Sequence, residues 1–510
     1  MIENFCQLKN ENALLFMLKF SNFVFIFVLE IFMDTLNSIL NTIDSYVWGI
    51  PLIVVILFVG LLLTIRLGGL QVVNLPNAIR FMLHNEKNGE GEVSSFGALC
   101  TALAATIGTG NIVGVATAIG TGGPGALFWM EIAAFLGMAT KYAEGLLAVK
   151  YRTVDKNKKV LGGPFYYIEC GIKERFGLNF KWLAVLFAVF GVLAGLLGIG
   201  TITQVNGITS AVSRVIPSGE WINISGNSVS YASAIAGLLV TLIVAFVIIG
   251  GIRRISKVSM VVVPFMALSY ILICILLLLG NFSKIPLAVE IIVQGAFNPS
   301  AVTGGVVGSI FIAMQKGIAR GIFSNEAGLG SAPIAAAAAK TKEPVRQGLV
   351  CMTGTFFDTI IICSMTGLAI VVTGAWRPEL GLEGVGITME AFSQGLSFLG
   401  VASNLAPWVL MISLVFFAFT TILGWAYYSE KCLQYLVGNG RKVKLIFRWL
   451  YVLAVFMGPY LTVSAVWTCA DIFNGLMAFP NLIALILLSG IVAKETKDFL
   501  DRLHNGKVGS

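Results

Sequence analysis

The stretch FGALCTALAATIGTGNIVGVATAIG, residues 96–120, is apolar and long enough to cross a bilayer, for which about 20 residues suffice. Its middle, Gly108-Thr109-Gly110-Asn111, is a poor helix, because each glycine costs about 1 kcal/mol relative to alanine. Hydrocarbon offers no water to loosened backbone groups. Transporters use helices broken at mid-membrane to hold a polar solute or an ion. We therefore expect this stretch to form the site, the alternative being that its glycines only permit close helix packing.

The composition predicts a polytopic membrane protein. Of the 510 residues, 57% are hydrophobic and only 12% are charged, against about 25% charged in soluble domains. The net charge of +8 fits basic loops on one side of a membrane and does not indicate a nucleic-acid partner. The eight cysteines form no CxxC, so we expect neither a disulfide framework nor a zinc site. The sequence shows no nucleophile–base pair and no phosphate loop, so we expect a protein that is not an enzyme and has no organic cofactor.

The order of the apolar segments predicts two halves of opposite orientation. Five spans lie in each half, and each half begins with a glycine-interrupted span. Inverted five-helix repeats with broken first helices are typical of LeuT-type secondary transporters, so we expect an all-α polytopic fold with broken first and sixth core helices. The segments are an N-terminal extension of uncertain structure at 1–45, an extra transmembrane span at 46–66, a first repeat at 96–280, a second at 301–493 and a tail at 494–510. Residues 13–33 could be a further span or an interfacial helix.

Lysine and arginine predict the orientation. They concentrate in alternate connecting segments, namely 66–95, 150–181, 251–257, 335–346 and 429–448. By the positive-inside rule these segments and the C-terminal tail are expected in the cytoplasm. The stretch 96–120 then runs outward.

A helix break presents two kinds of backbone group. The free N–H groups of Thr109, Gly110 and Asn111 begin the outer half-helix and can bind a carboxylate. The free carbonyls that end the inner half, at Ala104 and Ile107, suit a hard cation such as sodium.

Two further polar features lie in apolar spans. Thr420 and Thr421 are adjacent hydroxyls that could complete a cation site, or each could bond back to its own helix. Gln204 either joins helices or touches the solute, because a buried amide in lipid needs a partner.

The sixth core span carries less decisive signals. Phe311 and Met314 flank its presumed break, although ordinary core packing explains each of them, taken alone, better than a binding role does. Lys316 and Arg320 are expected to approach the cytoplasmic side, where Glu326 would pair with them as an inner gate or a structural salt bridge.

Three other intramembrane acids are functional candidates by default, without assigned roles: Glu144, Asp358 and Asp471.

Four motifs resemble the alanine/glycine:sodium symporter family, and the resemblance extends over roughly residues 45–495. They are GTGNIVGVATAI (108–119), PGALFWMEIAAFLGMATKYAEGLLAVKYR (124–152), GGPFYYIE (162–169) and GIARGIFSNEAGLGSAP (317–333). The resemblance implies a LeuT-type core with an extra N-terminal span in the cell (inner) membrane. It also implies sodium-coupled uptake of small neutral amino acids, alanine or glycine.

The resemblance further implies the site residues. Substrate contacts fall on Thr109, Gly110, Asn111 and Gln204, with Ile310, Phe311 and Met314 in the sixth span. The co-transported sodium falls on carbonyls of Ala104, Ile107 and Phe417 and hydroxyls of Thr420 and Thr421. Spacing puts the last three on one helical face.

Two alternatives stay open. A carrier of the same fold could couple to protons or exchange solutes, although residues 258–280 contain no lysine that would replace sodium. A channel or a membrane-bound sensor is the other, but a sensor would need a large soluble output domain. The expected partners are a small neutral amino acid, sodium and the lipid bilayer.

Overall fold

The computed structural model describes residues 35–84, 86, 89–154, 159–224, 227–297, 306–460 and 464–505. Within these residues nine helices are long and apolar enough to cross a membrane, or ten if one bent pair counts as a span. The predicted polytopic helical architecture is thus confirmed. The ambiguous segment 13–33 lies outside the described residues.

The described part of the chain opens with a helix over 35–47, which a short turn joins to α2. The first half then contains α2 (Ile50–Arg66), α3 (Leu70–Val73), α4 (Leu75–Leu83), α5 (Ser95–Thr106), η1 (Gly110–Gly114), α6 (Val115–Gly122), α7 (Gly125–Lys150), α8 (Pro164–Tyr166), η2 (Tyr167–Gly171), α9 (Ile172–Phe176), α10 (Lys181–Leu197), α11 (Ile202–Val215), α12 (Tyr231–Ile249) and α13 (Gly251–Gly280).

The second half repeats this order. It contains η3 (Phe282–Lys284), α14 (Ile285–Phe297), α16 (Val306–Asn325), α17 (Pro333–Ala336), α18 (Pro344–Thr355), η4 (Phe356–Cys363), α19 (Ser364–Thr373), η5 (Pro378–Leu380), α20 (Val385–Gly395), η6 (Ser397–Leu405), α21 (Ala406–Val437), α22 (Arg441–Met457), η7 (Gly458–Tyr460) and α23 (Ser464–His504).

Two short antiparallel ribbons lie in the connections and were not expected from an all-helical pattern. They pair β1 (Thr153–Val154) with β2 (Val160–Leu161), and β3 (Glu220–Ile224) with β4 (Asn227–Ser230).

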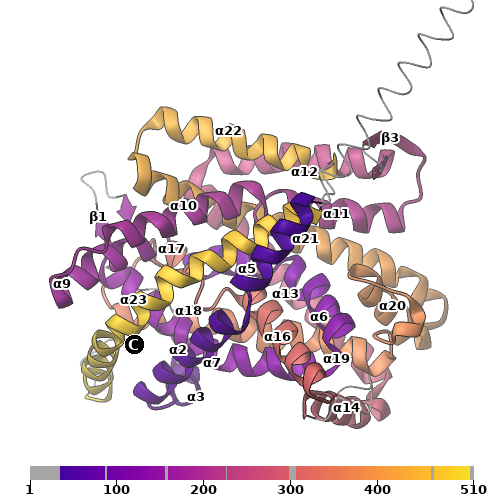
Figure 1. The fold of residues 1–510 in the computed structure, drawn as a ribbon, viewed down its shortest axis with the longest axis horizontal. Helices are drawn as coiled ribbons and strands as arrows, with labels where there is room; N and C mark the ends of the chain where they lie inside the picture. The colour runs from indigo at the N-terminus through magenta and orange to yellow at the C-terminus, as the bar shows by residue number, and fades with distance from the viewer. Residues whose placement is uncertain are drawn as a thin grey trace, which may run out of the picture.

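The first core span is broken where the sequence predicts. Ser94 begins it, because its hydroxyl accepts the N–H of Gly97 at 3.0 Å as an N-cap. Helix α5 ends at Thr106, and the chain resumes at Gly110 with its axis bent by 51°. In Figure 1, α5, α6 and α16 lie in the middle of the bundle, while α12 and α22 run along one edge.

The sixth core span is broken, but not where Phe311 and Met314 predict. Helix α16 is continuous from Val306 to Asn325, and the chain leaves it over residues 326–332. Glu326 there adopts a φ of 56°, the one positive value among the described non-glycine residues, and Gly328 and Gly330 follow with φ of 87° and 79°. Left-handed backbone cannot continue a right-handed helix, so the break lies at these residues.

Three other boundaries differ from the sequence prediction. The extra span extends from 35 to 66 rather than from 46, with a turn at Trp48 and Gly49. The third core span is divided between α10 and α11 at residues 198–201, where Tyr451 donates to the Gly200 carbonyl at 2.6 Å. The last helix continues through most of the predicted tail, to His504.

The two broken helices are joined through their backbones at the ends that lie near the basic connecting segments. We call the side of the molecule that carries the basic connecting segments 66–95, 150–181, 251–257, 335–346 and 429–448 the basic face. There residues 90–93 pair with 338–341: Glu92 N donates to Ala338 O at 2.8 Å and Lys340 N to Val93 O at 2.7 Å. We call this pairing the backbone zipper.

One guanidinium holds the backbone zipper from the side. Arg152 donates to four carbonyls at 2.6–2.8 Å, those of Glu90, Ala337, Ala339 and Thr341. Burial lowers the pKa of Arg152, while the neighbouring carboxylate of Glu90 opposes that shift. Arg152 therefore fixes the loop after α7 to the inner ends of both broken helices.

The Arg152→Gln variant is expected to destabilise the protein by about 3 kcal/mol, because hydrogen bonds to a charged group contribute about 1.5–3 kcal/mol each and do not add fully. The apparent melting temperature of the purified protein in detergent measures this. Arg175→Gln, in exposed α9 on the same face, is the matched control. Equal melting temperatures for the two variants would show that the clamp contributes nothing.

Candidate functional site

At the first break, two freed backbone N–H groups are bound by the side-chain carboxamides of Asn111 and Gln204. Gly108 N donates to Asn111 Oδ1 at 2.8 Å, and Thr109 N donates to Gln204 Oε1 at 3.4 Å. Asn111 and Gln204 are almost completely buried. The structure thus brings together Thr109, Asn111 and Gln204, three of the residues predicted to contact the solute.

The break also frees two backbone carbonyls, those of Ala104 and Ile107. In an unbroken helix, Gly108 N–H would donate to Ala104 O and Asn111 N–H to Ile107 O. Here Gly108 N–H is taken by the Asn111 side chain, and Asn111 N–H donates to Gly108 O at 3.3 Å. Ile107 has a ψ of 97°, so its carbonyl turns out of the helix. Both carbonyls are therefore available to other partners.

The hydroxyl pair of α21 faces this end of the break. Thr421 Oγ1 lies 3.3 Å from Ile107 O and 3.0 Å from Phe417 O, and Thr420 Oγ1 lies 2.9 Å from Phe417 O. All four residues are buried. Each hydroxyl bonds back to its own helix, and Thr421 also reaches across to α5. These oxygens form the cluster that the sequence assigns to sodium, with Ala104 buried in the adjoining turn.

Gly108 is required by the closeness of α5 and α21. A Cβ at Gly108 would lie 2.4 Å from Thr421 Oγ1, well inside van der Waals contact. Gly207 plays a similar part on α11, where a Cβ would lie 2.7 Å from Thr109 Cγ2. The two glycines allow neighbouring spans to touch the break.

Asp358 joins both broken helices, a role that the sequence does not reveal. Its carboxylate accepts from Asn111 Nδ2 at 2.8 Å, Ser324 Oγ at 2.9 Å and Thr359 Oγ1 at 2.7 Å. It is fully buried in η4, the wide turn of the seventh span. In the sequence, Asp358 is recognisable as an acid within an apolar segment, which indicates that it is important but not which residues it contacts.

The sixth span meets the first-helix break at its C-terminal end. A Cβ at Gly110 would lie 3.3 Å from the Ser324 Cα and 3.4 Å from the Phe323 ring. Phe311 lies twelve residues before Phe323 on the continuous helix, about 18 Å along its axis at 1.5 Å per residue. The structure therefore does not bring Phe311, nor its neighbours Ile310 and Met314, to the break.

Glu144 shapes the break in the sixth span. Its Oε1 accepts from Gly328 N at 3.1 Å, Gly330 N at 3.2 Å and Asn481 Nδ2 at 2.6 Å. An anionic acceptor satisfies two backbone donors that have left the helix. Glu144 is therefore a positioning residue for the inner end of the sixth span.

A cavity of about 800 Å³ leads to the first break from the side opposite the basic face. Its walls come from the ends of α6 and α11 and from residues 378–387, with Arg214 and Glu383 among them. Thr109 lies at its base, and the buried Thr109 Oγ1 has no hydrogen-bond partner in the described part of the chain. We call this cavity the vestibule.

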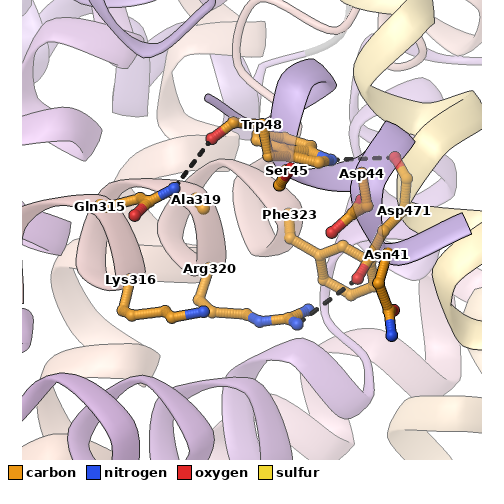
Figure 2. Close-up of a pocket in the computed structure, with 10 residues that line it drawn as sticks. All are labelled: Asn41, Asp44, Ser45, Trp48, Gln315, Lys316, Ala319, Arg320, Phe323 and Asp471. Atoms are coloured by element: carbon orange, nitrogen blue, oxygen red, sulfur yellow. Dashed lines mark hydrogen bonds and ion pairs between the residues drawn. The ribbon is translucent and has the colours of Figure 1, made fainter. Parts of the chain in front are cut away.

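Figure 2 shows a second pocket of about 270 Å³, bounded by the helix over 35–47, α16 and α23. Arg320 pairs with Asp471 at 3.4 Å, and its guanidinium lies 5.5 Å from the Phe323 ring. Trp48 Nε1 donates to the Asp471 carbonyl at 2.9 Å. Phe323 thus separates this charged pocket from Gly110.

The predicted pairing of Lys316 and Arg320 with Glu326 is wrong. Helix α16 directs Arg320 toward Asp471 of α23, as Figure 2 shows. Glu326 leaves the helix and instead accepts the Ser331 hydroxyl at 2.5 Å. The charged pair lies on the far side of the break from the basic face, so it is not an inner gate.

The chain is similar to known proteins over most of its length. A model of the sodium:alanine symporter family matches residues 33–509. An uncharacterized transporter of Haemophilus influenzae is 53% identical over 471 residues, which cover 92% of this chain and 97% of that protein. The sodium/alanine symporter AgcS of Methanococcus maripaludis is 47% identical over 466 residues, covering 91% and 97%.

A solved structure supports the fold. The crystal structure of MhsT in complex with L-phenylalanine superposes with a TM-score of 0.50, covering 80% of this chain and 98% of that one at 14% identity. MhsT is a LeuT-fold transporter, so the predicted LeuT-type architecture is confirmed.

The Gly108→Ala variant is expected to destabilise the protein by about 1–3 kcal/mol, the usual cost of overpacking, because the new methyl group displaces the Thr421 hydroxyl. Thermal unfolding in detergent measures this. Gly114→Ala is the matched control, since a Cβ there meets nothing within 4 Å. A Gly108→Ala protein as stable as the Gly114→Ala protein would refute the close approach of α5 and α21.

Proposed function

The chain belongs to the sodium:alanine symporter family, and we propose that it carries small neutral amino acids, alanine and glycine, into the cell together with sodium. The observation that carries this proposal is the first-helix break, which turns amides toward the base of an open vestibule and carbonyls toward a buried hydroxyl pair. One backbone segment thereby offers an anion-binding end and a cation-binding end. The protein is a transporter and not an enzyme.

The amide end suits the carboxylate of an amino acid. Thr109, Gly110 and Asn111 begin the outer half-helix, where N–H groups and the helix dipole favour negative charge. In this structure Gln204 accepts the Thr109 N–H at 3.4 Å, a long bond that a carboxylate would replace. The Gln204 carboxamide would then turn toward the solute. The unpartnered Thr109 hydroxyl supplies a further donor.

Close packing around the break limits the solute's side chain. Gly110 lies against Phe323 and Ser324, and Gly207 lies against Thr109. We propose that the solute side chain is limited here to a hydrogen or a methyl group, as in glycine and alanine. We propose Phe323 and Ser324 as the sixth-span contacts, in place of Ile310, Phe311 and Met314.

The carbonyl end suits sodium. We propose that the ion is held by the carbonyls of Ala104, Ile107 and Phe417 and the hydroxyls of Thr420 and Thr421. Hard cations prefer oxygen ligands, and the Thr421 hydroxyl already bridges α5 and α21. An ion at this place would turn the Thr421 lone pairs inward and tie the inner half-helix to α21 more firmly.

Coupling follows from the shared break. Sodium stabilises the arrangement in which Gly108 lies against α21, and that same arrangement orients the amides of Thr109 to Asn111. Each ligand therefore binds better when the other is present, as thermodynamic linkage requires. The backbone zipper and Arg152 close the opposite end while the vestibule is open.

The proposed orientation places the basic face in the cytoplasm of a cell (inner) membrane, with the C-terminus on that side. The excess of lysine and arginine on that face supports it. The vestibule would then open outward, as uptake requires.

Purified protein in proteoliposomes is expected to accumulate labelled alanine above its external concentration only when an inward sodium gradient is imposed. Labelled glycine is expected to behave alike and to compete with alanine. Protein-free vesicles with the same gradient are the control.

Each other outcome excludes the proposal in a different way. Accumulation driven by a proton gradient without sodium would indicate the proton-coupled alternative. Uptake that only equilibrates would indicate a channel, and uptake that requires internal amino acid would indicate an exchanger.

The Thr421→Ala variant is expected to raise the sodium concentration for half-maximal uptake about tenfold, equivalent to 1.4 kcal/mol, because one oxygen ligand is lost. Thr421→Ser retains the hydroxyl and is expected to stay near the parent value. Thr373→Ala is the control, since the Thr373 hydroxyl bonds only within its own helix. An unchanged sodium dependence in Thr421→Ala removes Thr421 from the ion site.

A further inference from the structure

A third cavity lies on the basic face, away from the vestibule and the helix breaks. It measures about 310 Å³ and is formed by the turn between α12 and α13, the end of α21 and the start of α22. None of its lining residues takes part in the transport site described above. We call it the interfacial pocket.

The interfacial pocket is strongly cationic. Its lining contains five basic side chains and two carboxylates: Lys159, Arg253, Lys431, Lys444, Arg448, Glu92 and Glu430. Both carboxylates are already paired, since Glu430 is bound by Arg448 at 2.6 and 2.9 Å and Glu92 lies 3.7 Å from Lys431. Arg253 and Lys444 have no hydrogen bond or ion pair from their side chains to any described residue. The interfacial pocket therefore has an excess of positive charge.

Two helix N-termini supply hydrogen-bond donors to the interfacial pocket. Helix α13 begins at Gly251 and α22 at Arg441, and the pocket is lined by Gly250 and Gly251 before one helix and Asn439 before the other. The first N–H groups of a helix have no partner within it and carry partial positive charge. The C-termini of α12 and α21 lie beside the same pocket, so the helix dipoles offset one another and the first N–H groups of α13 and α22 act there as hydrogen-bond donors.

The surface beside the pocket is apolar. Along α12, Phe246 is 70% exposed, and along α22, Ile446 and Trp449 are 61% and 56% exposed. Figure 1 shows α12 and α22 together along one edge of the bundle, and residues of this kind on the outer helices of a membrane protein face lipid.

We propose that the interfacial pocket binds the headgroup of an anionic phospholipid, whose acyl chains lie along Phe246 and Trp449. The phosphate would contact Arg253, Lys444 and the amides that begin α13 and α22. Basic pockets between spans at this level of the membrane recognise such headgroups. The proposed orientation decides only that the lipid comes from the cytoplasmic leaflet; the pocket's chemistry does not depend on the transported solute.

The lipid would lie next to a contact of the inner closure. Lys431 Nζ donates to Val160 O at 3.0 Å and pairs with Glu92, whose backbone N–H belongs to the backbone zipper. A phosphate in the pocket competes with Glu92 for Lys431. The bound headgroup is thereby coupled to the inner ends of both broken helices.

The test measures lipid retained by the purified protein. Native mass spectrometry after exchange into detergent with equal phosphatidylglycerol and phosphatidylcholine is expected to show several-fold more phosphatidylglycerol on the parent protein. The double variant Arg253→Gln, Lys444→Gln is expected to lose at least two thirds of that excess. Lys173→Gln, Arg175→Gln carries the same charge change on exposed α9 and is expected to keep it. The single variant Lys444→Gln, at the pocket's rim, gives an intermediate loss.

Three outcomes overturn the proposal. One is equal retention of the two lipids by the parent protein. Another is equal retention of phosphatidylglycerol by both double variants, with gel filtration and sodium-driven alanine uptake confirming that each is folded. The third is complete displacement of the lipid by inorganic phosphate at millimolar concentration, which would assign the pocket to a soluble anion. Loss of alanine uptake in every protein, including the parent, would refute the proposed function and leave lipid retention unaffected.

Discussion

The hydrocarbon core leaves no backbone amide or carbonyl without a partner, and the site of this protein follows from how its first core span meets that constraint. A helix broken at Gly108 loses its own hydrogen bonds, and neighbouring side chains replace them: Asn111 and Gln204 accept the freed amides, and Thr421 binds the freed carbonyl of Ile107. The bonds of Gln204 and Thr421, at 3.4 and 3.3 Å, are long bonds that a ligand can take over, whereas Asn111 holds the Gly108 N–H at 2.8 Å. The side-chain hydrogen bonds that stabilise the broken helix therefore also hold its backbone groups in position for the solute and the ion.

The break in the sixth span obeys the same constraint with stronger partners. Glu144 binds two freed amides, and Asp358 gathers hydroxyl and amide donors from the first, sixth and seventh spans. An isolated buried carboxylate would be very unfavourable, so these two are stable only while the donors surround them. Glu144 sets the shape of the segment that leaves α16, whereas Asp358 binds Asn111 and Ser324 and so fixes the first break to the end of α16. The two buried acids therefore hold the breaks in place, while the backbone amides at the first break are left for ligands to bind.

The sequence predicted the parts of the site that depend on local pattern. Glycine and asparagine at mid-span locate the first break, and the hydroxyl pair in α21 is conspicuous in an apolar run. The sixth break was misplaced because Glu326 begins it, and a charged residue with left-handed backbone has no local signature. The contact of Arg320 with Asp471 and that of Asn111 with Asp358 join residues 151 and 247 positions apart. Only tertiary packing brings such pairs together, so periodicity and composition cannot reveal them.

The backbone zipper has a consequence for how the basic face opens. Residues 90–93 and 338–341 are bonded main chain to main chain, so the bonds need no particular side-chain chemistry. They do need small residues, because Ala338 and Ala339 are fully buried and a Cβ on Gly91 would lie 2.4 Å from Ala339 O. Helices α5 and α17, which the backbone zipper joins, therefore move together rather than separately. The amide protons of Val93 and Lys340 can exchange with solvent only when the backbone zipper opens. Their hydrogen-exchange rates therefore report how often the basic face opens.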